Sequence, residues 1–167
     1  MRFKSVPPPP DSLVFLERAQ AAVPLVPEEE ESCCVRLASR LEEVNRDEAR
    51  SWLAFMRALG LAEAGNLGYV RTRRSVDPNT LRTPFVERIF GAREVLDHLE
   101  TTGSSTADEA FEAIEAVIPQ WERHRNPGTW ATEWRDRVEY LLEWAALFEL
   151  VDASGPRYSR RYPSDDW

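Results

Sequence analysis

Apolar positions between residues 46 and 60 recur at i, i+3, i+4 and i+7, the spacing of a helix that buries one face. They are Trp52, Phe55, Met56 and Leu59. Gly60 follows directly, and a glycine at this place typically ends a helix. Residues 61–72 then predict two short strands, because Gly65 and Asn66 permit the positive φ angles of a tight turn between them. The stretch is therefore expected to form a helix followed by a β-hairpin.

The same pattern returns 89 residues further on, where residues 135–160 align with residues 46–71 without a gap. Seven aligned pairs are identical, namely Arg46/Arg135, Asp47/Asp136, Leu53/Leu142, Leu61/Leu150, Ala64/Ala153, Tyr69/Tyr158 and Arg71/Arg160. The apolar stripe is also kept, as Leu141, Trp144, Ala145 and Phe148. Composition alone would not give so many matches in so short a window. We therefore predict one supersecondary unit that is present twice.

Two further helices are expected ahead of this element in the first half of the chain. One covers about residues 11–22, where Asp11 or Ser12 can accept the free amide hydrogens of the first turn. The other covers residues 28–43 and begins with four glutamates, which suit the positive end of a helix dipole.

Two helices are also expected ahead of the second copy. A weaker similarity between residues 85–88 and residues 15–18 places the first over about 84–100, with Thr83 as its cap and Pro84 at its first position. The second follows a capping box formed by Thr106 and Glu109, ahead of an apolar stripe.

Three helices followed by a two-stranded hairpin resemble the winged-helix (winged helix-turn-helix) fold. The passage from Phe55 to Thr72 is similar to the helix-3-to-wing passage of small prokaryotic transcription regulators. The resemblance implies a mostly α protein with small β-hairpins, built from two tandem winged-helix units. The expected organisation is a proline-rich tail at 1–10, unit 1 at 11–76, a linker at 77–79, unit 2 at 80–162 with an insertion at 119–132, and a C-terminal tail at 163–167.

The composition is acidic and unevenly distributed. The chain has 29 acidic and 21 basic residues and a net charge of −8, and Lys4 is its only lysine. This arginine-rich, acidic composition suggests a high-GC prokaryote with a salt-rich cytoplasm. Residues 1–79 carry 11 basic and 12 acidic side chains, whereas residues 80–167 carry 10 and 17. A polyanion is therefore expected to meet the first half of the chain.

A cytoplasmic protein is expected, since no apolar run approaches the roughly 18 residues of a membrane span and no secretory signal opens the chain. The two cysteines, Cys33 and Cys34, lack the C-x-x-C spacing of a zinc or redox site. A buried reduced pair is the simpler interpretation, and redox sensing is the alternative. We expect no metal and no cofactor.

Arginines on the third helix and the hairpin of the first half are the candidate DNA-binding residues. They are Arg46, Arg50 and Arg57 on one side of the helix, and Arg71, Arg73 and Arg74 on the wing and its exit. The winged-helix resemblance implies that the helix reads the major groove and the wing touches the backbone. The alternative is a set of surface ion pairs, in which Glu42 and Glu43 neutralise Arg46 and Arg50. Asp47 and Glu48 also argue against DNA contact by the first turn.

The second half is expected to hold a partner rather than DNA. Its equivalent helix carries Arg135, but acidic residues dominate its polar positions. The insertion at 119–132 combines tryptophan with arginine, and its candidate partner-binding residues are Trp121, Arg123, Arg125 and Trp130. The simpler interpretation is that these tryptophans cover a small core while residues 126–128 form a turn.

The sequence as a whole favours a DNA-binding winged-helix protein that regulates transcription, with double-stranded DNA as its partner. The alternative is a non-catalytic scaffold for protein interaction or dimerisation, with a homodimer or protein partner held by unit 2 and no membrane contact. Catalysis is not expected, because His98 and His124 are the only histidines and no nucleophile or phosphate-binding motif occurs.

Overall fold

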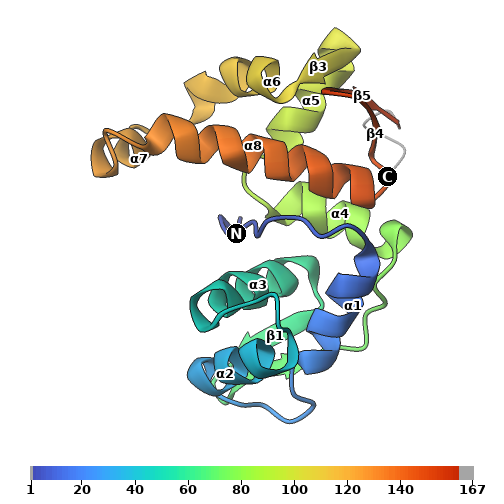
Figure 1. The fold of residues 1–167 in the computed structure, drawn as a ribbon, viewed down its shortest axis with the longest axis vertical. Helices are drawn as coiled ribbons and strands as arrows, with labels where there is room; N and C mark the ends of the chain where they lie inside the picture. Colours follow the sequence, from blue (N-terminus) through green and yellow to red (C-terminus); the bar gives the residue numbers. More distant parts are fainter. Residues whose placement is uncertain (1, 162–167) are drawn as a thin grey trace. The chain divides into compact units, whose positions relative to one another are not determined.

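The computed structural model describes residues 2–161, and its contacts divide the chain into two compact units with the boundary after Phe90. The protein is mostly helical and has two small antiparallel sheets, as the sequence predicts (Figure 1). The predicted linker at 77–79 falls inside the first of these units. The predicted tail at 163–167 lies outside the described residues.

The first unit contains four helices and one hairpin. Its elements are α1 (Leu13–Ala22), α2 (Glu30–Arg40), α3 (Arg46–Leu59), β1 (Ala62–Gly65), β2 (Gly68–Arg71) and α4 (Pro78–Arg88). Local signals set the ends of α3: Asn45 and Glu48 form a capping box at its start, and Gly60 ends it with a φ of +80°. Ser12, one of the two expected caps, accepts the amide of Val14 at the start of α1.

The hairpin of the first unit gains a third chain segment. β1 and β2 pair antiparallel, and Glu28, ahead of α2, pairs with Tyr69 on the other side of β2. Gly68 makes this approach possible: its φ is +112°, and a Cβ atom there would lie 2.0 Å from the carbonyl oxygen of Glu28. The segment between α1 and α2 is thereby joined to the wing.

The helix α4 differs from the sequence prediction. A single helix over 84–100 was expected, but α4 ends at Arg88 and a separate helix, α5 (Ala92–Thr102), follows Gly91, whose φ is +94°. The start is also earlier than Thr83, because Asp77 caps α4 and Pro78 occupies its first turn. The similarity of residues 85–88 to residues 15–18 therefore does not mark equivalent helices. α4 packs on α3 in the first unit.

The second unit also has two helices, a long helix and a hairpin in that order, with additional short elements ahead of the long helix and no described helix after the hairpin. Its elements are α5, β3 (Ser104–Thr106), α6 (Ala107–Ile114), the short 3-10 helix η1 (Glu115–Val117), α7 (Gln120–Arg125), α8 (Trp130–Leu147), β4 (Val151–Ser154) and β5 (Arg157–Arg160). The strands form one sheet in the order β3-β5-β4. The capping box of Thr106 and Glu109 is present as predicted.

The 89-residue repeat holds in three dimensions. β4 and β5 begin and end 89 residues after β1 and β2, so Tyr69 and Tyr158 occupy the same place in their hairpins. Both tyrosines face the strand-like segment ahead of the second helix, Glu28 in one unit and Ser105 in the other. The apolar stripes of α3 and α8 fill the two cores, with Phe55 and Trp144 fully buried.

Candidate nucleic-acid interface

Two of the six candidate arginines are held by carboxylates of α2. Arg46 donates to Glu31 at 2.6 Å, and Arg50 donates to Glu30 at 2.8 Å and to Glu31 at 3.2 Å. The hydrogen bond from Arg46 and its charge hold the pKa of Glu31 below its ordinary value. Glu42 and Glu43 were expected as partners, but the neighbouring helix supplies them instead. The carboxylates largely cancel the positive charge of this end of α3.

Arg71 has a structural position inside the first unit. Its guanidinium donates to the backbone carbonyls of Val23 at 2.9 Å and Ala21 at 2.8 Å. These bonds tie β2 to the C-terminal end of α1. The N–H donors of Arg71 therefore stabilise the fold, although no carboxylate cancels the charge of the guanidinium in these bonds.

Arg57 contacts the ring of one aromatic side chain and the hydroxyl of another. Its guanidinium carbon lies 5.5 Å from the centre of the Phe3 ring, a cation-π distance, and it donates to the Tyr69 hydroxyl. Burial raises the pKa of Tyr69, and the charge and hydrogen bond of Arg57 oppose that rise. Both partners are neutral, so Arg57 keeps its full charge.

Arg74 packs against a glycine and supplies a hydrogen bond that a proline in α4 cannot make. Its guanidinium passes over Gly60 and donates to the carbonyl of Thr80 at 3.4 Å. Pro84 stands four residues after Thr80 and has no amide hydrogen to offer this carbonyl, so the arginine supplies the donor. Arg73, one residue earlier, is exposed.

Three arginines line one hollow of about 580 Å³ on the first unit, which we call the arginine hollow. Its lining consists of Phe3, Arg57, Gly60, Ala62, Glu63, Ala64, Arg74 and Arg88. Within residues 2–161, none of its three guanidinium groups forms an ion pair, and Glu63 is its single carboxylate. The hollow is therefore a site of net positive charge.

Sequence reasoning missed Arg88 and Phe3. Arg88 was assigned to the start of a helix in unit 2, whereas it ends α4. Phe3 joins it through the backbone: the amide of Phe3 donates to the carbonyl of Arg88 at 2.6 Å, and the amide of Phe90 donates to Phe3 at 2.9 Å. In the sequence, the basic residues Arg2 and Lys4 on either side of Phe3 were the signal that could have drawn attention to this segment.

The surface of α3 is largely covered. The helix packs on α2, β1 and α4, and from Trp52 onward only Ala54 and Arg57 are partly exposed. The segment of residues 2–10, here called the N-terminal strap, also contacts α3 through Phe3 and Arg57. Insertion of the C-terminal half of α3 into a major groove, as the winged-helix resemblance implies, would require these contacts to open.

The basic residues of the second hairpin and helix have acidic partners. Arg135 pairs with Asp108 and with Glu139, and Arg157 pairs with Glu109. Burial and the nearby charge of Glu139 raise the pKa of Glu143 on the same helix. The corresponding face of the second unit therefore presents no comparable unpaired guanidinium cluster among the described residues.

The insertion at 119–132 is mostly helical, and its four candidate residues form one packed pair and one exposed pair. Arg123 stacks on Trp130 at 4.5 Å and donates to the carbonyl of Glu115, so both belong to a local cluster. Trp121 is 57% exposed, and Arg125 is exposed as well. Residues 126–129 form a turn between α7 and α8, as the simpler interpretation expected.

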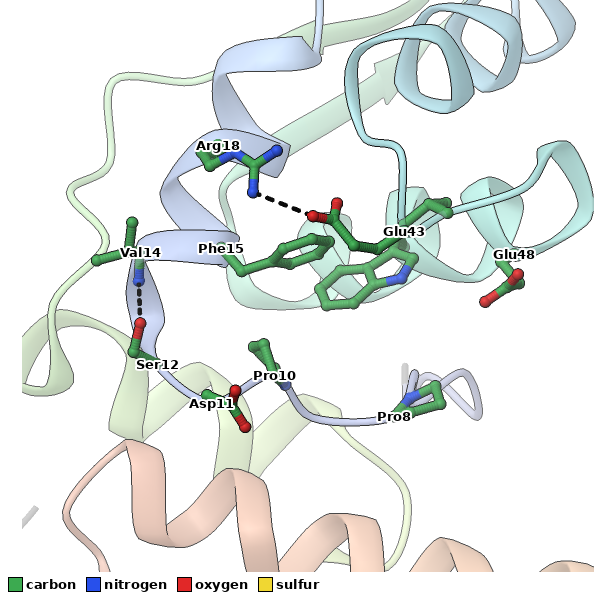
Figure 2. A pocket seen from close by; sticks show the side chains of 11 residues that line it. Pro8, Pro10, Asp11, Ser12, Val14, Phe15, Arg18, Glu43 and Glu48 are labelled. Atoms are coloured by element: carbon green, nitrogen blue, oxygen red, sulfur yellow. Dashed lines mark hydrogen bonds and ion pairs between the residues drawn. The ribbon is translucent and has the colours of Figure 1, made fainter.

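A second hollow of about 440 Å³, here called the aromatic hollow, is lined by Pro8 and Pro10 of the strap and by residues of α1 and α3 (Figure 2). Figure 2 shows Arg18 and Glu43 along one rim, Pro10 and Asp11 along the other, and the Phe15 ring between them. Pro8, Ser12, Val14, Val44, Glu48 and Trp52 complete its lining. Its charge is opposite to that of the arginine hollow.

The remaining chemistry is sparse. Within residues 2–161, no group of three or more His, Cys, Asp or Glu side chains is placed to hold a metal ion. Cys33 and Cys34 are free thiols and fully buried. None of the described helices combines the length and the apolar character needed to cross a membrane.

The comparisons with known proteins agree with the repeated architecture. The model of one family, described as the halobacterial double winged helix domain, matches residues 1–164. No curated protein and no solved structure matches the chain significantly. The family model covers nearly the whole sequence and both units. The chain therefore belongs to the halobacterial double winged helix domain family.

Proposed function

We propose that the protein is a DNA-binding regulator of transcription, and that its first unit holds DNA phosphates in the arginine hollow. The carrying observation is that Arg57, Arg74 and Arg88 line one hollow without an ion pair among the described residues. Membership of a winged-helix family suggests a DNA-binding or regulatory role. In this proposal the protein acts by binding and not by catalysis.

The groups that each arginine contacts determine whether we assign it to phosphate binding or to the fold. A guanidinium bonded to a ring, a hydroxyl or a backbone carbonyl keeps its charge, whereas one bonded to a carboxylate loses most of its attraction for phosphate. Arg57 and Arg74 are of the first kind, with exposed Arg73 beside them. We therefore assign phosphate contact to Arg57, Arg73, Arg74 and Arg88. Arg46 and Arg50 are assigned to holding the unit together through their carboxylates. Arg71 keeps its charge but is assigned the same role, because its donors are bonded to the carbonyls of Val23 and Ala21 and it does not line the hollow.

The coverage of α3 favours contact with the DNA backbone over base reading by that helix. Phosphate contacts position a protein on the duplex but carry no sequence information by themselves. Each phosphate neutralised makes the slope of log K against log salt more negative by about 0.9. The composition and the family's description both suggest a salty setting, in which this electrostatic contribution is small and shape has to supply part of the affinity.

Fluorescence anisotropy on random-sequence duplexes, titrated from low to high salt, tests the proposal. Arg73→Gln with Arg88→Gln should weaken binding about tenfold at low salt. It should also reduce the magnitude of the salt slope by about 2, because two phosphate contacts are lost. Arg46→Gln with Arg50→Gln is the matched control: it removes the same charge and should leave the slope unchanged. Circular dichroism at each salt concentration verifies folding. The proposal fails if the intact protein does not bind at low salt, or if both pairs change binding equally.

An exposed apolar surface on the second unit favours a second candidate function, protein interaction. Trp121 on α7 and Val117, four residues earlier, are both more than half exposed. Exposed tryptophans often anchor protein interfaces. We propose that this surface contributes to a homodimer. Sedimentation of the intact protein and of Trp121→Ala tests this, since a monomeric intact protein would contradict it.

A further inference from the structure

The aromatic hollow points to a ligand of opposite charge to DNA, and we propose that it binds an organic cation: a guanidinium or ammonium group on an apolar stem. This inference concerns a different site from the arginine hollow and does not depend on the proposed DNA binding. Three features of the hollow support this ligand: its walls, the charge of its rim and the Arg18 cation that already lies there.

The walls supply an apolar and aromatic surface. Phe15 and Trp52 lie with their ring centres 5.0 Å apart and their planes tilted by 54°. Both rings line the hollow, and Trp52 is only 4% exposed whereas Phe15 is half-buried. Pro8 and Pro10 of the strap stand beside them (Figure 2). An alkyl stem or a flat guanidinium can pack against such a wall.

The rim supplies negative charge from three separate segments. Asp11 precedes α1, Glu43 lies between α2 and α3, and Glu48 is in the first turn of α3. Arg18 is the one positive group of the lining and pairs with Glu43 at 3.6 Å. Within residues 2–161, Asp11 makes no hydrogen bond or ion pair. Asp11 and Glu48 are thus two carboxylates beyond the charge that Arg18 balances.

Arg18 shows the geometry that a bound cation would take. Its guanidinium carbon lies 5.5 Å from the centre of the Phe15 ring while the same group pairs with Glu43. One guanidinium is therefore already held by a ring and a carboxylate together. A cation-π contact contributes about 0.5–1 kcal/mol at an exposed site, and a nearby carboxylate adds to it. A second cation between Phe15, Asp11 and Glu48 would use the same combination.

Two sources could supply this chemistry, and the test separates them. The full chain is titrated by calorimetry and by amide and indole NMR with butylguanidinium, with the neutral isostere butylurea, and with a short peptide of alternating glycine and arginine. We expect both cations to bind and butylurea to bind at least tenfold more weakly. Their relative affinity identifies the source: tighter binding of the peptide indicates a protein segment, and tighter binding of butylguanidinium indicates a free metabolite.

The variants locate the site. Asp11→Asn with Glu48→Gln should weaken cation binding about tenfold, and Glu48→Gln keeps the capping geometry that Glu48 provides for α3. Glu17→Gln, on the exposed side of α1, is a control that removes one carboxylate outside the lining, and it should have no effect. The proposal is overturned if neither cation binds, if butylurea binds as tightly as butylguanidinium, or if Glu17→Gln weakens binding as much as the double variant. The far-ultraviolet circular dichroism of each variant shows whether it is folded.

Discussion

At the scale of single residues, the arginines of the first unit differ by what they contact. Arg46 and Arg50 meet carboxylates, Arg71 meets backbone carbonyls, and Arg57 meets an aromatic ring and a hydroxyl. Sequence spacing placed them on common faces but could not assign these partners. The partners come from α2, from the end of α1 and from the strap, and only folding brings those segments to α3 and β2. A count of arginines therefore overestimates the charge available to a polyanion.

The buried cysteines give a prediction at the same scale. Burial, together with the nearby charge of Glu28, raises the pKa of Cys33 to about 11. Because the thiolate is the reactive form, both thiols should react with an aromatic disulfide reagent at least 100-fold more slowly in the native protein than in guanidinium chloride. A native reaction as fast as that of the unfolded chain would favour the redox-sensing alternative.

The raised pKa of Cys33 also predicts a pH dependence of stability. The unfolded thiol ionises near its usual pKa of about 8.5, whereas the folded thiol stays protonated until about pH 11. This contribution is therefore fully present below about pH 8.5 and is lost as the pH rises toward 11. Urea midpoints should fall between pH 7.5 and pH 10, and Cys33→Ala should show a smaller fall. An equal fall in both proteins would contradict the assignment.

At the scale of elements, local signals predicted what local chemistry determines. The capping box at Thr106, the end of α3 at Gly60 and the location of the first hairpin turn form as expected. The positive φ angle of that hairpin, however, lies at Gly68 and not at Gly65 or Asn66. The position of α4 was wrong because two start signals compete: Asp77 with Pro78, and Thr83 with Pro84. Pro84 is accommodated inside the helix, where Arg74 supplies the donor for the carbonyl of Thr80. No local pattern reveals such a compensation.

The wing offers a matched pair of glycines for testing how it is held. Gly68→Ala should destabilise the first unit by about 2 kcal/mol or more, because its φ is +112° and its new Cβ atom would meet the carbonyl of Glu28. Gly65→Ala, in the same hairpin, meets nothing within 4 Å and should change stability by less than about 0.5 kcal/mol. Urea unfolding measures both. Equal effects would show that the Glu28 contact does not restrain the wing.

At the scale of the whole molecule, the repeat separates what the fold needs from what binding uses. The buried stripe and the tyrosine of each hairpin are kept in both units. Polar positions diverge: among residues 2–161, Arg57, Arg74 and Arg88 of the first unit line one hollow without an ion pair, whereas Arg135 and Arg157 of the second unit pair with carboxylates. Arg57, Arg73 and Arg74 could be nominated from the sequence. Phe3 and Arg88 could not, because their place beside α3 depends on contacts between distant segments.

Leu53 and Leu142, an identical pair of the repeat that is fully buried in both units, allow the division of labour to be tested. Leu→Ala at a buried position costs about 2–5 kcal/mol, and each substitution disturbs one core. If DNA binding resides in the first unit, Leu53→Ala should lower both the amide protection of that unit and DNA affinity. Leu142→Ala should lower protection in the second unit while affinity stays within about twofold, since the arginine hollow is intact. Hydrogen exchange and anisotropy on the same samples measure both. Loss of DNA binding in Leu142→Ala, with protection of the first unit unchanged, would place a necessary DNA contact in the second unit.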